Sequence, residues 1–393
     1  MDDAAFKTYV LNDLINSGFN EIWYGKPIPT EIGLKNLVMI GFESWTFNCQ
    51  PYLSKHPEDA LLDNKGVRRF IPGDARKNEI CTTLLLEDSP AWKYLEEIIR
   101  EFIKRKKVDN MDWDYEQNVW SSDISCYCPR CLEKFKKFAK ISSSEKLTPE
   151  IIKKNYRKQW IKFMNMRMAL LCGRFREAAR KANPEIIFSV YSGYQCDTTK
   201  EGYGVDWSML ADKIDLAICG YGRPEKQIAD TLSALGKTPL ALGHIVSPYD
   251  VKKQEYPGFA SKAILLRRAV DGTGGIMIWY LTQLDGRTFY ASAEISRLVA
   301  DYESLFIFHQ KDNSLVEVSG MSPDDVTVFT DGKTRLILLI NEDNVKKKVK
   351  VVNEKFNQKM KVYDYYQEKD LGNLKEITVE ILPNDVKALV VSE

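Results

Sequence analysis

Apolar and polar positions follow two rhythms over the first three quarters of the chain. Short apolar runs are typical of strands, whereas longer stretches with apolar residues three or four positions apart are typical of amphipathic helices. The pattern predicts strands at residues 21–25, 37–42, 108–115, 185–194, 214–221, 239–246 and 274–280. It predicts helices at residues 4–17, 90–106, 156–182, 206–212, 225–235, 258–270 and 289–304. Strands and helices therefore alternate along the chain.

This alternation indicates a parallel sheet covered by helices, which is an α/β fold. Seven strands with a helix before the first predict a (β/α)8 TIM-type barrel whose first strand the pattern does not show. A barrel of seven strands and a doubly wound open sheet are the alternatives. Because no glycine-rich phosphate loop follows the first predicted strand, the open sheet is disfavoured.

The pattern changes near residue 308. From there to the end, short runs such as VTVFTD, TRLILLIN and EITVEIL recur with turn residues between them. Such runs are typical of an antiparallel β-sandwich. We therefore predict a barrel catalytic domain over residues 1–307 and a β-sandwich accessory domain over residues 308–393.

The overall composition narrows the classes of partner. A net charge of +1 gives no reason to expect a polyanion, so nucleic acid is not favoured. No apolar stretch is long enough to span a membrane, and the N-terminal MDDAAFKTYV lacks the layout of a signal peptide. We therefore expect a cytoplasmic protein with neither a membrane nor a nucleic acid as partner, and its oligomeric state stays open.

The densest chemical signal is the acidic run VDNMDWDYEQ at residues 108–117. Asp112, Asp114 and Glu116 alternate, so on a strand their side chains point to one side. In a barrel that side can be the lumen and the C-terminal rim, where barrel enzymes keep their chemistry. Three acids on one face repel one another, which raises at least one pKa and keeps a carboxylic acid protonated near neutrality. The run therefore predicts a catalytic proton donor, with a Mg²⁺ or Ca²⁺ site and a solvated edge strand as alternatives.

Glycoside cleavage needs such a proton donor beside an ionised partner. The run Asp109-x-x-Asp112-x-Asp114-x-Glu116 resembles the D-x-x-D-x-D-x-E signature of glycoside hydrolase family 18. The resemblance implies that Glu116 is the acid and that Asp114 orients the N-acetyl group of the substrate, whose oxygen is the nucleophile. It also implies that Asp112 tunes Asp114.

Two aromatic residues enter through the same resemblance. The stretch GGIMIWYLTQLDG at residues 274–286 is similar to the last strand of that family, which would make Trp279 the platform under the sugar. Tyr221 lies where the family places a tyrosine near the acetamide. The Met-x-Tyr-Asp pattern of the family reads Cys219-Gly220-Tyr221-Gly222 here, so specificity for N-acetyl sugars stays open.

Three cysteines lie within six residues, in the order Cys126-x-Cys128-x-x-Cys131. That density predicts a zinc site, although a structural site needs a fourth ligand. Cys81 is the candidate because it lies in the loop after the predicted strand 37–42, on the same rim. Four thiolates leave no open coordination position, so we expect a structural Zn²⁺ and no organic cofactor. Free cysteines in a loop are the alternative.

The cysteine layout is similar to that of glycoside hydrolase family 42, the β-galactosidases. There, a distant cysteine before a Ser-Pro helix start joins a C-x-C-x-x-C that follows the strand-4 acid. Here Cys81 precedes Ser89-Pro90, and Cys126 follows Glu116 by ten residues. The resemblance covers roughly residues 66–138 and implies a barrel hydrolase with Glu116 at the acid position. The predicted strand 239–246 lacks the carboxylate that this family uses as nucleophile.

The remaining candidates lie at predicted strand ends. Glu43 and Asp285 are rim carboxylates, and either could be the second acid of a retaining or inverting mechanism. Trp45 and His244 are candidates for contacts with a sugar, with core packing as the alternative. The sequence thus predicts a glycoside hydrolase that cleaves O-glycosidic bonds of an oligo- or polysaccharide. A non-catalytic carbohydrate-binding barrel is the other class that stays open.

Overall fold

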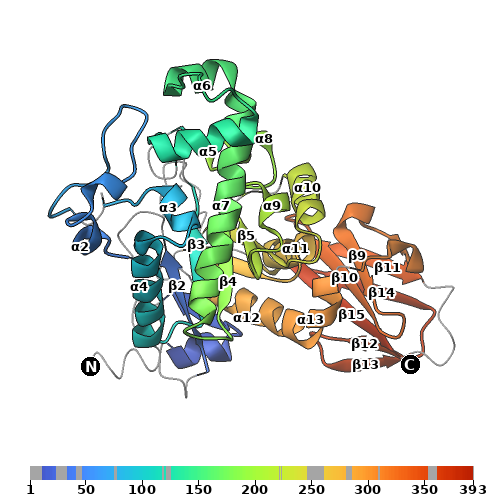
Figure 1. Ribbon diagram of the computed structural model, residues 1–393. Helices are drawn as coiled ribbons and strands as arrows, with labels where there is room; N and C mark the ends of the chain where they lie inside the picture. The colour runs from blue at the N-terminus through green and yellow to red at the C-terminus, as the bar shows by residue number, and fades with distance from the viewer. Residues whose placement is uncertain are drawn as a thin grey trace. The chain divides into compact units, whose positions relative to one another are not determined.

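The chain folds into two compact units in the computed structural model (Figure 1). One unit comprises residues 21–238, and the other comprises residues 1–20 together with residues 239–393. The structure describes residues 11–23, 33–40, 47–74, 78–116, 119–120, 125–220, 222, 224–245, 261–279, 286–308, 310–352 and 361–392.

Parallel strands form the centre of the unit 21–238, and their order in the sheet is their order in the chain. They are β1 (Glu21–Trp23), β2 (Lys35–Ile40), β3 (Asn110–Asp114), β4 (Ile187–Ser192) and β5 (Leu216–Cys219). The register pairs Asp112 of β3 with Met39 of β2 and with Ser189 of β4. Asp114, the last residue of β3, is paired with Tyr191. Acidic and hydroxyl side chains therefore lie side by side on β3 and β4.

Helices connect these strands. They are α2 (Gln50–Leu53), α3 (Thr82–Leu86), α4 (Pro90–Lys106), α5 (Pro129–Ala139), α6 (Pro149–Asn155), α7 (Arg157–Arg180), α8 (Asp197–Gly202), α9 (Trp207–Leu210) and α10 (Glu225–Leu235). Figure 1 shows the two long helices α4 and α7 beside each other, with α5 near one end of α7. The start of α4 agrees with the sequence prediction, because the Ser89 side chain accepts a hydrogen bond from the Trp92 N–H and Pro90 occupies the first helical turn.

The packing of Trp113 decides which face of β3 is covered by helix. Its ring lies 4.7 Å from the ring of Phe175 on α7 and 6.3 Å from that of Phe188 on β4. Because side chains alternate along a strand, Asp112 and Asp114 must point to the face away from α7. That is the arrangement of a helix-covered parallel sheet whose other face carries the polar residues.

Residues 239–308 contribute two further parallel strands, β6 (Leu240–Ile245) and β7 (Ile276–Trp279), which pair with each other. The helices α11 (Lys262–Asp271), α12 (Gly286–Asp301) and α13 (Glu303–Phe308) belong to the same part of the chain. All seven predicted strands are thus confirmed. An eighth parallel strand, and with it the complete (β/α)8 barrel, is not seen in the part of the chain that the structure describes.

Antiparallel sheets follow after residue 308, as the sequence predicts. Their strands are β8 (Glu317–Ser319), β9 (Val326–Thr330), β10 (Arg335–Asn341), β11 (Lys347–Val352), β12 (Lys361–Asp364), β13 (Lys369–Gly372), β14 (Glu376–Ile381) and β15 (Asp385–Ser392). One sheet has the order β13-β12-β15-β10-β9, and the other has the order β14-β11-β8. Aliphatic side chains such as Ile337, Leu339 and Val349 form a core between the two sheets.

The other face of the five-stranded sheet packs on helices of the same unit. Leu338 and Phe329 belong to one buried cluster with Leu266 of α11 and Phe306 of α13. The buried Arg267 of α11 also binds Asp325, with 2.8 Å between Nη2 and Oδ1. The antiparallel sheets therefore have a core of their own and a second apolar face that α11 and α13 cover. The domain boundary at residue 308 stays a prediction.

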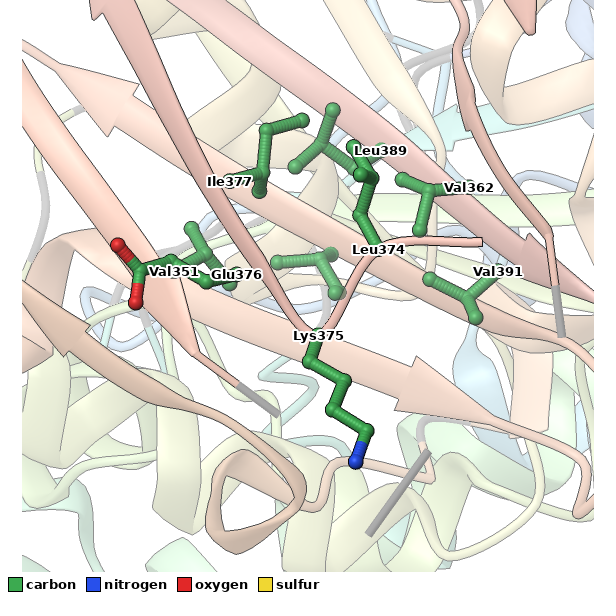
Figure 2. Close-up of a pocket in the computed structure, with 9 residues that line it drawn as sticks. Val351, Val362, Leu374, Lys375, Glu376, Ile377, Leu389 and Val391 are labelled. Carbon is green, nitrogen blue, oxygen red and sulfur yellow. The ribbon is translucent and has the colours of Figure 1, made fainter. Parts of the chain in front are cut away.

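A small pocket lies between the two antiparallel sheets (Figure 2). Its lining is mainly aliphatic, and Figure 2 shows the side chain of Lys375 pointing away from the apolar residues. It brings no chemically reactive group together with another, so we do not regard it as a functional site.

Among the described residues, no helix combines the length and the apolar character needed to cross a membrane.

Candidate functional site

The acidic run is anchored at Asp112, in the middle of β3. Its side chain is 1% exposed, and the hydroxyl of Ser189 on β4 lies 2.6 Å from its Oδ1 atom. The same hydroxyl lies 3.0 Å from Oδ1 of Asn110. Asp112 is therefore buried within the sheet, two residues before the end of β3 that Asp114 forms.

Asp114 and Glu116 follow at the carboxyl end of β3. Asp114 is half-buried, and its Oδ1 atom is buried without a hydrogen-bond partner among the described residues. Burial, and next the charge of Glu116, raises the pKa of Asp114 from 3.8 to about 6. Glu116 is an exposed residue, but the surrounding protein partly desolvates its carboxyl group and raises its pKa as well. The two acids thus form a coupled pair of which one member can hold a proton at mildly acidic pH.

Tyr203 is a neighbour of this pair that the sequence analysis missed. The charge of Glu116 is the main cause that raises the pKa of its phenol, followed by burial. Its ring lies against Gly193, which directly follows β4, because a Cβ atom at Gly193 would come within 3.3 Å of the ring. The residue stands just after the short polar helix α8, where no hydrophobic periodicity signals an element. Nothing in the sequence therefore connects it with Glu116.

The other predicted substrate-binding residues fall outside what the structure describes. This applies to Glu43, Trp45, Tyr221 and Asp285. His244 and Trp279 belong to β6 and β7, whose backbones are described and whose side chains at these positions are not. Near Tyr221, the hydroxyl of Tyr194 donates to the carbonyl oxygens of Gly220 and Gly222 at 2.9 and 3.1 Å, which ties the ends of β4 and β5 together.

The second candidate site is the cluster of Cys81, Cys126, Cys128 and Cys131, which the structure brings together as the sequence predicts. All four side chains are buried, and the four Sγ atoms lie within 4.8 Å of one another. Cys81 Sγ lies 3.5 Å from Cys128 Sγ and 3.5 Å from Cys131 Sγ. Those separations are too long for a disulfide, which requires about 2.05 Å.

Local helix starts position the cysteines. Cys81 immediately precedes α3, and Cys128 immediately precedes α5, which has Cys131 in its first turn. The loops are also joined by backbone hydrogen bonds, since Tyr127 N donates to Leu62 O at 2.8 Å. Leu62 N in turn donates to Cys126 Sγ at 3.4 Å. The cluster therefore holds together two loops that follow different strands.

The cluster is chemically suited to a metal ion. A tetrahedron with zinc–sulfur bonds of about 2.3 Å has edges of about 3.8 Å, close to the separations between the Sγ atoms here. Burial alone would raise the pKa of Cys131, but hydrogen bonds from the other three cysteines and the charge of Arg167 hold it well below its usual range. The pKa of Cys128 falls to about 7, chiefly through its hydrogen bond with Cys126. The pKa values of Cys81 and Cys126 are raised instead, that of Cys126 chiefly through its hydrogen bond with Cys128. Four buried sulfurs this close together could hold a metal ion, which binds them as thiolates and releases their protons.

Comparison with solved structures finds a similar fold in several TIM-barrel glycoside hydrolases. A catalytic mutant of a family 42 β-galactosidase from G. stearothermophilus matches with a TM-score of 0.59 at 10% identity, over 100% of this chain and 96% of that one. A β-galactosidase from Bacillus circulans sp. alkalophilus matches with a TM-score of 0.56 at 9% identity, over 99% and 97%.

A third match is an α-amylase from Geobacillus thermoleovorans in complex with acarbose. Its TM-score is 0.55 at 10% identity, and the alignment covers 98% of this chain and 91% of that one. No protein-family model and no curated protein matches the chain. At these identities the comparisons show a shared fold alone.

The raised pKa of Asp114 predicts a pH-dependent effect of Asp114→Asn on stability. Between pH 4 and pH 6 the folded protein keeps a proton that the unfolded chain loses, so this carboxyl group lowers the stability of the wild type as the pH rises. Relative to the wild type, Asp114→Asn should therefore gain stability between pH 4 and pH 7, by up to about 3 kcal/mol for a shift of about two pKa units. Urea unfolding of both proteins at the two pH values measures it.

Asp331→Asn provides a control of opposite sign. Backbone hydrogen bonds from Thr334 and Lys333 hold the pKa of Asp331 below its usual value. Its carboxylate therefore stabilises the folded protein at pH values above the pKa that this group has in the unfolded chain. The free energy of unfolding of Asp331→Asn should fall relative to that of the wild type as the pH rises. A stability difference for Asp114→Asn that does not change with pH would contradict the desolvated state of Asp114.

Proposed function

We propose that the protein is a glycoside hydrolase that cleaves O-glycosidic bonds of an oligo- or polysaccharide. Glu116 is the general acid and base, and Asp114 assists it. The observation that carries this proposal is the pair of desolvated, mutually repelling carboxyl groups at the carboxyl end of β3. The shared fold supports it, because barrel enzymes keep their chemistry at the carboxyl ends of their strands.

The two acids divide the work by their surroundings. Glu116 is the exposed member and is free to reach the glycosidic oxygen, to which it gives its proton as the bond breaks. Asp114 is half-buried, and its pKa is raised to about 6. In its protonated form it orients an N-acetyl group of the substrate by a hydrogen bond, and in its ionised form its charge stabilises the positive centre that develops on the sugar. Asp112 supports this pair from within the sheet through its contact with Ser189.

The rest of the cleft is assigned by position in the sequence. Trp279, Tyr221, Trp45 and His244 line it and contact the sugar. Glu43 and Asp285, which follow β2 and β7, are the candidates for a second carboxylate if Asp114 does not supply the assistance. We further propose that the parallel sheet closes into a (β/α)8 barrel over residues 1–307, with residues 308–393 as an accessory β-sandwich.

Cys81, Cys126, Cys128 and Cys131 hold one structural Zn²⁺ in this proposal. When bound, the ion would stabilise the folded loops after β2 and β3 and would take no part in the reaction, since four thiolates leave it no open coordination position.

We predict one zinc per chain in protein purified without added metal, with four sulfur neighbours at about 2.3 Å by X-ray absorption. Cys131→Ser should lose the metal. Cys172→Ala changes a buried cysteine that lies outside the cluster, on α7, and should keep it.

The protonation role predicts the kinetics of Glu116→Gln. The amide keeps the shape of the side chain but has no proton to transfer, so turnover of glycosides with poor leaving groups should fall about 10²–10⁴-fold. Aryl glycosides with activated leaving groups need less protonation and should lose less. Glu97→Gln, at an exposed position on α4, should be fully active. An unchanged rate for Glu116→Gln on every glycoside that the wild type cleaves would refute the proposal.

The source of assistance is tested with three amide variants. Asp114→Asn should strongly lower the turnover of glycosides with poor leaving groups and of those with activated leaving groups. The reason is that Asp114 acts on the reacting centre of the sugar rather than on the leaving group. Glu43→Gln and Asp285→Asn should then keep most of the activity. If Asp114→Asn is nearly silent and one of the other two is inactive, the second carboxylate acts from across the cleft.

A further inference from the structure

Arg167, in the middle of α7, is a buried cation in an unusual environment. Its side chain is 3% exposed. Among the residues that the structure describes, no carboxylate lies within ion-pair distance of it. Its Nη2 atom lies 3.0 Å from Thr83 Oγ1 and 3.6 Å from Cys131 Sγ, and its guanidinium carbon lies 5.0 Å from the ring centre of Phe163.

A buried guanidinium group cannot lose its charge, so it needs a negative partner in its place. The chain provides one elsewhere. The buried Arg267 of α11 binds Asp325 and Glu342, each at 2.8 Å. At Arg167 the sulfur of Cys131 takes the position that carboxylates take around Arg267. The positive charge of Arg167 is therefore neutralised by its surroundings only if the cysteine cluster carries a negative charge.

Thr83 strengthens this connection. Its hydroxyl lies 3.0 Å from Cys131 Sγ and also contacts the Arg167 guanidinium, so the three groups form a closed triangle. A divalent cation held by four thiolates leaves a net charge of −2 on the centre. Charge-assisted N–H···S and O–H···S hydrogen bonds would stabilise that charge and fix the direction of the Cys131 side chain.

We propose that Arg167 is a positioning residue for the metal centre: it supplies the positive charge that balances a dianionic metal–tetrathiolate and, with Thr83, orients Cys131. The inference rests on the metal site proposed above and is independent of the glycosidase activity. It also extends the centre beyond the two loops, because Arg167 belongs to α7, which contacts both α3 and α5. Metal binding would then stabilise the packing of α7 against the loops.

The test measures zinc affinity by competition with a chelator in the full-length protein. Arg167→Met keeps the aliphatic stem but removes the charge, and its affinity for Zn²⁺ should fall about 10–100-fold. Arg167→Lys keeps the charge but lacks the planar guanidinium group. Its affinity for Zn²⁺ should lie between those of Arg167→Met and the wild type. The matched control is Arg180→Met on the same helix, at a partly exposed arginine that binds Asp215, and it should bind zinc like the wild type.

Thermal unfolding with and without zinc separates positioning from a purely structural role. The increase in Tm that zinc produces should be smaller in Arg167→Met than in the wild type. A lowering of Tm by the same amount in both states, with zinc affinity unchanged, would overturn the inference. If Arg167→Met does not fold, Thr83→Val replaces it, and wild-type affinity in that variant would overturn the inference equally. A wild-type protein that binds no zinc would refute the metal site itself, and with it the role of Arg167.

Discussion

The alternation of side chains along β3 is the constraint on which the candidate active site depends. Trp113 is buried against Phe175 of α7 and Phe188 of β4. Once that ring is fixed, a strand geometry with a period of two sends Asp112 and Asp114 to the opposite face. A shift of one residue would expose the indole and bury the acids against α7, so apolar packing and the acid arrangement enforce each other.

The electrostatic properties of the pair follow from that placement. The Ser189 hydroxyl donates a hydrogen bond to Asp112, whereas Asp114 lies at the end of the strand with a buried oxygen to which no described residue donates a hydrogen bond. Its ionised form is therefore destabilised twice, by burial and by the charge of Glu116. Folding energy holds the carboxyl groups in this unfavourable state, which is how acid catalysis near neutral pH becomes available to a carboxylic acid.

The described residues between Glu116 and the cysteine cluster are held by contacts with α7. Between Glu116 and Cys126, the carbonyl oxygen of Val119 accepts hydrogen bonds from Trp160 Nε1, at 3.3 Å, and from Ser125 Oγ. Tyr127 stacks on Trp160 with 4.9 Å between the ring centres. Val119 and Tyr127, which follow the acid in the sequence, thus contact Trp160 of α7, and Tyr127 lies between two cysteines of the cluster in the sequence.

The sequence predicted those features that depend on local pattern or on reactive side chains close together. The apolar runs located all seven strands, and the three close cysteines with a candidate fourth gave the complete cluster. Arg167 and Tyr203 were missed for a physical reason. Each reaches its site only through tertiary packing, Arg167 from an amphipathic helix and Tyr203 from beside the short helix α8, and a lone arginine or tyrosine carries no spacing signal. Closure of the barrel likewise depends on long-range pairing that no local pattern encodes.

The central claim is that Asp114 and Glu116 form a desolvated, coupled pair able to hold a proton for catalysis. Titration of the Asp114 carboxyl carbon by ¹³C NMR, in the wild type and in Glu116→Gln, tests it without knowledge of the substrate. The account predicts a midpoint near pH 6 in the wild type and a lower midpoint in the variant, because removal of the Glu116 charge removes one cause of the shift. A midpoint near the ordinary value of 3.8, or one that Glu116→Gln leaves unchanged, would contradict it.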